Sequence, residues 1–147
     1  MATSTATTRP ELIFQDGFES GGLTGWTSSV TNGGALSAST AAALVGATGL
    51  RAAINSNTAI YVTDDTPAAE PRYRARFYFD PNSLTMASGN AHYIFYGYSG
   101  ASTVVLRIEY RFQSPNRQIR AALVNNAQDR FGGAALGFAV LAGRFLP

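Results

Sequence analysis

The sequence predicts an all-β domain, an antiparallel β-sandwich of the jelly-roll type, and three observations favour this fold class. Apolar and polar residues alternate with a period of two in several short stretches, as expected for strands that bury one face. Turn-forming residues separate these stretches, for example in segments 32–34 (Asn-Gly-Gly) and 114–116 (Ser-Pro-Asn). No stretch combines a sustained 3.6-residue period with helix caps, so strands must pack against strands.

The size and composition of the chain fit one globular domain preceded by a linker. Of its 147 residues, 46% are hydrophobic and 14% are charged, which supplies enough apolar residues for one core. Residues 1–10 are rich in Thr, Ser and Ala, the composition of a linker. We expect the sandwich domain to occupy residues 11–147, with no clear pattern in 126–147. The first ten residues have no apolar core, so the export signal of a secreted protein would lie outside this chain.

Composition also excludes several classes of function. The chain has no cysteine, which rules out a disulfide scaffold and a cysteine-ligated zinc site. Its net charge is +2 and it contains no run of basic residues, so we expect no nucleic-acid partner. No stretch reaches the roughly 18 apolar residues of a membrane-spanning helix, so we expect no membrane span.

The expected strands follow in order along the chain. Four weaker candidates come first, at residues 26–30, 36–40, 49–54 and 59–63. The clearest alternation lies in residues 72–79, where one face holds Tyr73, Ala75, Phe77 and Phe79 and the other Arg72, Arg74, Arg76 and Tyr78. Residues 80–83 (Asp-Pro-Asn-Ser) end this strand and are expected to cap a single helical turn that reaches Met86.

Further strands are expected in the second half of the chain. Residues 91–98 carry aromatic side chains on both faces, so both faces should be at least partly covered. Residues 103–112 place Val104, Leu106, Ile108, Tyr110 and Phe112 opposite Val105, Arg107, Glu109 and Arg111. Residues 118–125 alternate in the same way, and after Asn126 the alternation fades. A last strand is expected at 138–142.

Two segments resemble a known family of domains. The opening segment from Asp16 to Trp26 (DGFESGGLTGW) and the segment from Tyr61 to Gly97 are similar to secreted bacterial domains of the concanavalin A-like lectin/glucanase (LamG-like) jelly-roll family. The resemblance covers residues 11–125 and implies a concanavalin A-like jelly roll that is extracellular or at the cell surface. The tail lacks the His/Glu/Trp-rich strands and the Trp-Ile-Asp-Gly-like hairpin of these domains, so we expect a copy that is truncated or divergent at its C-terminus.

The resemblance also implies a structural calcium ion. Acidic residues of the first motif often help to bind calcium in related modules, and here these are Asp16 and Glu19. Calcium takes six to eight hard oxygen ligands, which carboxylates and turn carbonyls supply. In the alternative interpretation Asp16 starts a turn and Glu19 is solvated. Trp26, which closes the motif, is expected to be a buried anchor rather than an exposed sugar-stacking residue.

A candidate ligand-binding face follows from the alternation. If strands 72–79, 103–112 and 118–124 share one sheet, their polar faces gather five arginines and Glu109, with tyrosines available for stacking. The candidate ligand-binding residues are Arg74, Arg76, Tyr78, Tyr96, Arg107, Glu109, Arg111 and Arg120. Guanidinium groups suit bidentate contacts to sugar carboxylates or sulfates, which predicts a groove for an anionic polysaccharide. The alternative is an exposed ladder of cross-strand ion pairs.

The sequence leaves enzymatic activity open and carries no complete catalytic motif. The segment 107–111 (Arg-Ile-Glu-Tyr-Arg) has the Arg-x-Glu-x-Arg form of the cleft strand in jelly-roll alginate lyases. Those enzymes also need a His and a Tyr, whereas the one histidine, His92, lies upstream of the segment and no matching Tyr motif follows. The Glu-x-Asp-x-x-Glu motif of glucanases is absent, and Glu109 has no second carboxylate within its strand for glycoside cleavage.

Three functions are therefore considered. The first is a non-catalytic extracellular carbohydrate-binding module for an anionic polysaccharide. The second is a structural or adhesive surface domain that contacts protein or itself, with self-association through an uncovered sheet edge. The third is a polysaccharide lyase or glycoside hydrolase remnant.

Overall fold

The computed structural model describes residues 12–66, 73–123, 136–140 and 144–146. These residues form nine strands and one short 3-10 turn, η1 (Thr40–Ala42). The strands are β1 (Ser28–Val30), β2 (Leu36–Ser39), β3 (Gly49–Ala53), β4 (Tyr61–Asp64), β5 (Ala91–Ser99), β6 (Thr103–Gln113), β7 (Asn116–Leu123), β8 (Leu136–Val140) and β9 (Arg144–Leu146). The prediction of an all-β chain is confirmed for this part of the molecule.

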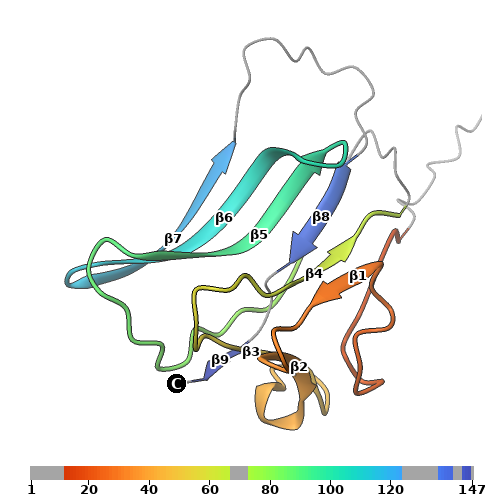
Figure 1. Cartoon of the computed structure of the whole chain (residues 1–147), viewed down its shortest axis with the longest axis horizontal. Helices are drawn as coiled ribbons and strands as arrows, with labels where there is room; N and C mark the ends of the chain where they lie inside the picture. Colours follow the sequence, from red (N-terminus) through yellow and green to blue (C-terminus); the bar gives the residue numbers. More distant parts are fainter. Residues whose placement is uncertain (1–11, 67–72, 124–135, 141–143, 147) are drawn as a thin grey trace, which may run out of the picture.

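The strands form two sheets (Figure 1). The larger sheet has six strands in the order β1-β4-β8-β5-β6-β7, and every neighbouring pair in it is antiparallel. The smaller sheet has the order β2-β3-β9, in which β2 and β3 are antiparallel and β3 and β9 are parallel. The long hairpins β5–β6 and β6–β7 make up one half of the large sheet, and residues 114–115 alone connect β6 to β7.

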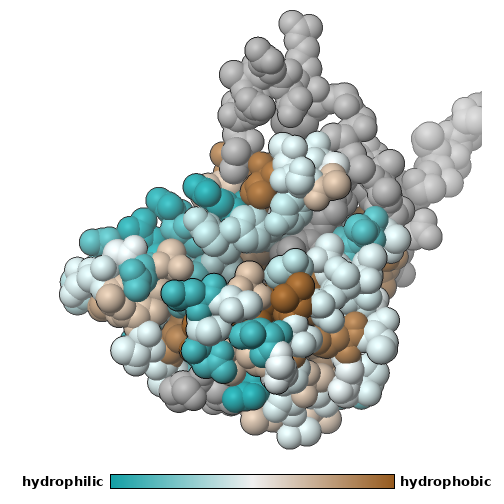
Figure 2. All heavy atoms as spheres, viewed as in Figure 1, coloured by the Kyte–Doolittle hydropathy of each residue, from teal (hydrophilic) through white to brown (hydrophobic). Residues whose placement is uncertain are grey.

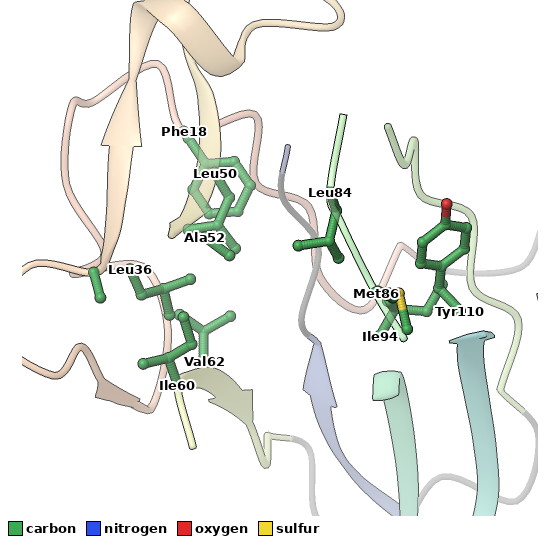
Figure 3. Packing of buried hydrophobic residues seen from close by; sticks show 11 residues of the cluster. Phe18, Leu36, Leu50, Ala52, Ile60, Val62, Leu84, Met86, Ile94 and Tyr110 are labelled. Carbon is green, nitrogen blue, oxygen red and sulfur yellow. The ribbon is translucent and has the colours of Figure 1, made fainter. Parts of the chain in front are cut away.

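One hydrophobic cluster joins the two sheets (Figure 3). Its buried members are Phe18, Ala35, Leu36, Leu50, Ala52, Ile60, Val62, Leu84, Met86, Ile94 and Tyr110. Leu36 of the small sheet and Val62 and Ile94 of the large sheet have their side chains almost fully excluded from solvent. Full burial of a side chain of this size stabilises the folded state by about 1.5–3 kcal/mol. The alternation that places these residues inward therefore specifies which face of each sheet meets the core.

The clearest strand expected from the sequence, residues 72–79, is not a strand of either sheet. Residues 73–80 form no ladder with a neighbour, although their alternation is realised in their burial. The Phe77 ring stacks on Phe95, with centroids 5.8 Å apart, and Phe79 meets Tyr110 at 5.6 Å, both packed against the core. Alternation of apolar and polar residues indicates an extended segment with one buried face. Pairing in a sheet also requires a second strand whose backbone lies about 4.8 Å away.

The remaining expectations differ from the structure in smaller ways. The helical turn expected through Met86 is absent: Asn82 has φ +49°, and the Leu84 amide donates to the Pro81 carbonyl (3.2 Å) in a single turn. The other strands expected before residue 124 are confirmed with shifts of one or two residues at their ends. The strand expected at 138–142 overlaps β8 (Leu136–Val140). Residues 141–142 of the expected strand lie outside the described residues. The linker 1–10 and residues 126–135 also lie outside them, and β9 was not expected.

Candidate functional site

The opening motif is a hydrogen-bonded clamp around the tryptophan. The two carboxylate oxygens of Asp16 accept different donors: Oδ1 accepts from the Phe18 amide (2.7 Å) and Oδ2 from Trp26 Nε1 (2.8 Å). The Trp26 ring lies 4.6 Å from Phe14 and is stacked at 6.0 Å on Phe18, centroid to centroid. Trp26 is partly buried and packs against the core, in agreement with its expected role as an anchor. Asp16 thus fixes the indole through its polar edge.

Glu19 holds a second loop of the chain. Its carboxylate accepts hydrogen bonds from the amides of Ala47 (3.0 Å) and Thr48 (3.3 Å), 28 and 29 residues away in the sequence. Gly46 precedes these amides with φ +79°, and a Cβ atom at this position would overlap the Glu19 carboxylate. Successive amides that converge on an anion form a backbone nest, which Glu19 fills from within the chain.

Calcium binding by Asp16 and Glu19 remains a prediction. Both carboxylates accept hydrogen bonds from the chain itself, as described above. Within the described ranges, no group of three or more His, Cys, Asp or Glu side chains could hold a metal ion. An ion at either carboxylate would thus need most of its six to eight oxygen ligands from backbone carbonyls and water.

The outer face of strands β5, β6 and β7 brings together five of the eight expected ligand-binding residues. The β-register places Tyr93 (β5) and Arg120 (β7) directly opposite Glu109 (β6). It also places Tyr96 opposite Arg107. We call this surface the tyrosine–arginine face, and its members are Tyr93, Tyr96, Tyr98, Arg107, Glu109, Arg111 and Arg120. Figure 2 shows hydrophilic residues over the region of β6 and β7.

Glu109 neutralises one arginine of this face. Its side chain is only 5% exposed, and its Oε1 forms a salt bridge with Arg120 Nε at 2.7 Å. Arg111 Nη1 lies 4.0 Å from the same oxygen, and Arg111 Nη2 donates to Gln113 (3.0 Å). The structure thus contains one cross-strand ion pair, between Glu109 and Arg120, rather than the exposed ladder of Arg107, Glu109 and Arg111 pairs that the alternative interpretation expected. The alternation alone, which places Glu109 on the polar face of its strand, does not predict this burial.

Arg107 stands apart from this ion pair. Its guanidinium carbon lies over the Tyr93 ring, 5.6 Å from the centroid, in a cation–π contact. Among the described residues, the Nε atoms of Arg107 and Arg111 are buried and have no hydrogen-bond partner. Buried donors of this kind are normally hydrogen-bonded, so these two N–H groups are exceptional. Planar carboxylates fit the fork of an arginine.

Three tyrosines form a row along β5 beside these arginines. The ring centroids of Tyr93 and Tyr96 lie 5.0 Å apart, and those of Tyr96 and Tyr98 lie 5.9 Å apart. Burial raises the pKa of the Tyr96 hydroxyl to about 12, and Tyr93 and Tyr98 act in the same direction. Burial, followed by the influence of Tyr61, also raises the pKa of Tyr98. These two hydroxyls therefore stay protonated at neutral pH and can donate hydrogen bonds.

The structure separates the other three expected residues from this face. Arg74, Arg76 and Tyr78 are exposed on the segment whose alternate residues, Phe77 and Phe79, pack on the core side of β5 and β6. The condition that segment 72–79 shares one sheet with β6 and β7 is therefore not met for its described residues, and Arg74 and Arg76 do not join the face. Arg76 instead lies 6.0 Å from the ring of Tyr78, in a contact within its own segment.

Sequence reasoning missed Tyr93 and Tyr98 as members of the face. A strict period of two would put Tyr93 and Tyr96 on opposite faces of the strand. An irregularity between Tyr93 and Phe95 shifts the phase, so that both rings meet on the same face. A second irregularity, between Gly97 and Tyr98, has its extra residue, Val105, in β6.

Comparison with known proteins adds no identification. No family model, no curated protein and no solved structure matches this chain. In the part of the chain that the structure describes, no helix has the length and apolar character needed to cross a membrane.

Proposed function

We propose that this chain is a non-catalytic, extracellular carbohydrate-binding module that binds an anionic polysaccharide on its tyrosine–arginine face. The two sheets joined by one core are consistent with a sandwich of the concanavalin A-like jelly-roll type, as the sequence resemblance implies. The observation that carries the proposal is the pairing of Arg107 with a row of tyrosines. Arg107 has a buried Nε without a hydrogen-bond partner among the described residues, and it lies against Tyr93 beside Tyr96.

The chemistry of the face favours an acidic sugar chain. Glu109 is paired with Arg120, so the charges of Arg107 and Arg111 leave the face with a net positive charge. Arg107 and Arg111 are four residues apart on one strand, a span of about 13 Å that suits an extended polymer. Tyrosine rings offer flat apolar surface to sugar rings, and protonated hydroxyls offer donors.

Retention on immobilised polysaccharides tests the proposal. The test compares wild type with the double variant Arg107→Ala/Arg111→Ala on polygalacturonate, on alginate and on a neutral glucan. The matched control is Arg74→Ala/Arg76→Ala, which removes the same charge from exposed positions outside the face. Loss of one charge-assisted hydrogen bond is worth about 1.5–3 kcal/mol, so the first variant should bind acidic polysaccharide at least about tenfold more weakly. The control should retain its affinity apart from a small general charge effect.

Two outcomes would contradict the proposal. One is a wild-type protein that binds none of the polysaccharides. The other is unchanged retention of the Arg107→Ala/Arg111→Ala variant with a melting temperature that shows an intact fold. Product release from the uronate polymers would instead favour the lyase alternative.

A further inference from the structure

The outer edge of β7 presents backbone groups that no described strand pairs. β7 is the last strand in the order of the large sheet and contacts β6 alone among the described strands. The phase of its hydrogen bonds follows from Phe112, whose N–H and C=O are bonded to Asn90 and Gly89 on the side away from β7. The Phe112–Arg117 pair is therefore a non-hydrogen-bonded pair of the β6–β7 ladder.

The same alternation fixes which groups of β7 point outward. From Arg117 onward, every second residue directs its N–H and C=O away from β6, because antiparallel ladders alternate between the two kinds of pair. These residues are Arg117, Ile119, Ala121 and Leu123. An edge of this kind is a template for another strand, and natural proteins usually block it with a charge, a proline or a covering segment.

Two large apolar side chains stand on this edge strand. Ile119 is 57% exposed and Leu123 is 82% exposed, and both lie on the same face of β7 because they are four residues apart. The cluster that fills the core includes neither of them. The strand therefore has both unpaired backbone groups along its edge and exposed apolar side chains. A second strand that pairs with this edge would cover both.

We propose that β7 pairs with β7 of a second copy of this chain, antiparallel about a two-fold axis at Ala121. In this register Ile119 of each copy lies directly opposite Leu123 of the other, so both exposed side chains gain an apolar partner. The directly opposed residues at the centre, Ala121 and Ala121 of the second copy, both have outward backbone groups. The backbone hydrogen bonds of the new ladder are thus available without breaking any bond to β6.

The charges of the strand agree with this register. A two-fold axis one residue earlier would place Arg120 opposite Arg120 of the second copy, which is unfavourable. The axis at Ala121 places Arg120 opposite Ala122 instead. The Glu109 carboxylate, 2.7 Å from Arg120 Nε, offsets the remaining charge on each side.

The pairing would join two copies into one continuous sheet. Directly opposed residues point to the same side of a sheet, so the two tyrosine–arginine faces would lie side by side. One short strand pair makes a smaller contact than the roughly 1,200 Å² of a stable complex, so the dimer should dissociate on dilution. Two linked faces would bind a repeating polymer more tightly than one.

Sedimentation of the full chain over a range of concentrations tests the proposal. We expect a monomer–dimer equilibrium that Leu123→Glu weakens at least about tenfold, since each dimer contains two contacts between Ile119 and Leu123. The matched control is Val45→Glu, which introduces the same charge at a loop residue that is 63% exposed and far from β7 in the sequence. A wild-type chain that stays monomeric at millimolar concentration, or equal weakening by both substitutions, would overturn the proposal.

Single cysteines test the register, because the natural chain has none. Opposed Cα atoms in a sheet lie within the separation that a disulfide spans, so Ala121→Cys should form a covalent dimer on mild oxidation. Arg120→Cys and Ile119→Cys place the thiol one and two residues from the axis and should react more slowly. Faster crosslinking of either would contradict the register. Both experiments are independent of glycan binding.

Discussion

Replacement of Asp16 tests whether the opening motif is a structural clamp. Asp16→Ala removes the acceptors of two hydrogen bonds, at 2.7 Å to the Phe18 amide and 2.8 Å to Trp26 Nε1. A hydrogen bond to a charged group contributes about 1.5–3 kcal/mol, and partial exposure lets water replace part of it. We therefore expect a loss of about 2–3 kcal/mol in the free energy of unfolding. For a chain of this size this lowers the melting temperature by roughly 4–12 °C.

The conservative variant Asp16→Asn separates the two bonds. An asparagine keeps an oxygen for the Phe18 amide but places an NH₂ group against the indole N–H, so we expect a loss of about 1–2 kcal/mol. Thermal unfolding followed by circular dichroism measures both variants. Trp26 is the single tryptophan of the chain, so its fluorescence should also shift to longer wavelength as its surroundings loosen.

A double-mutant cycle with Trp26→Phe isolates the indole contact. In the Trp26→Phe background the penalty of Asp16→Asn should shrink, because the N–H donor is already gone. An equal penalty in both backgrounds, or a loss below about 1 kcal/mol for Asp16→Ala, would refute the clamp. Melting with calcium and with a chelator tests the calcium prediction on the same proteins. A bound ion requires that calcium raise the melting temperature of wild type more than that of Asp16→Ala.

Two further predictions concern stability. Gly46→Ala should lower the free energy of unfolding more than Gly21→Ala, although both glycines have positive φ. The reason is that a Cβ atom at Gly46 would overlap the Glu19 carboxylate, whereas one at Gly21 has no atom within 4 Å. Urea unfolding measures both variants, and an equal loss would contradict the contact. Burial lowers the pKa of His92 from 6.5, so the folded state disfavours the protonated ring. The contribution of neutral His92 to the free energy of unfolding should be fully present above pH 6.5 and be lost as the pH falls toward the lower pKa of the folded state. In His92→Gln the melting temperature should depend less on pH over this window.

Much of the fold could be predicted from local pattern. Strands β2, β3, β5 and β6 appear close to their expected positions, because each alternates toward a core that buries one face. Arg107, Glu109 and Arg111 share a face for the same local reason, since they are two residues apart on one strand. This part of the candidate face needed no knowledge of the neighbouring strands.

The rest of the face depended on partners that local pattern does not encode. Segment 73–80 has the clearest alternation in the chain and still pairs with no strand, which removed Arg74, Arg76 and Tyr78 from the face. Tyr93 lies on the tyrosine–arginine face because the register of β5 shifts between Tyr93 and Phe95, which breaks the period of two. The ion pair of Glu109 likewise depends on Arg120 of the neighbouring strand β7, which the register places opposite it.

The sequence by itself determined that the chain is all-β, where most strands begin and end, and which side chains of each strand share a face. These properties follow from steric and hydrophobic preferences of neighbouring residues. The tertiary structure alone decided which strands are adjacent, which carboxylate meets which arginine, and that β7 is an edge of the described sheet. Those outcomes depend on backbone hydrogen bonds between distant segments, and the backbone is chemically almost the same at every residue.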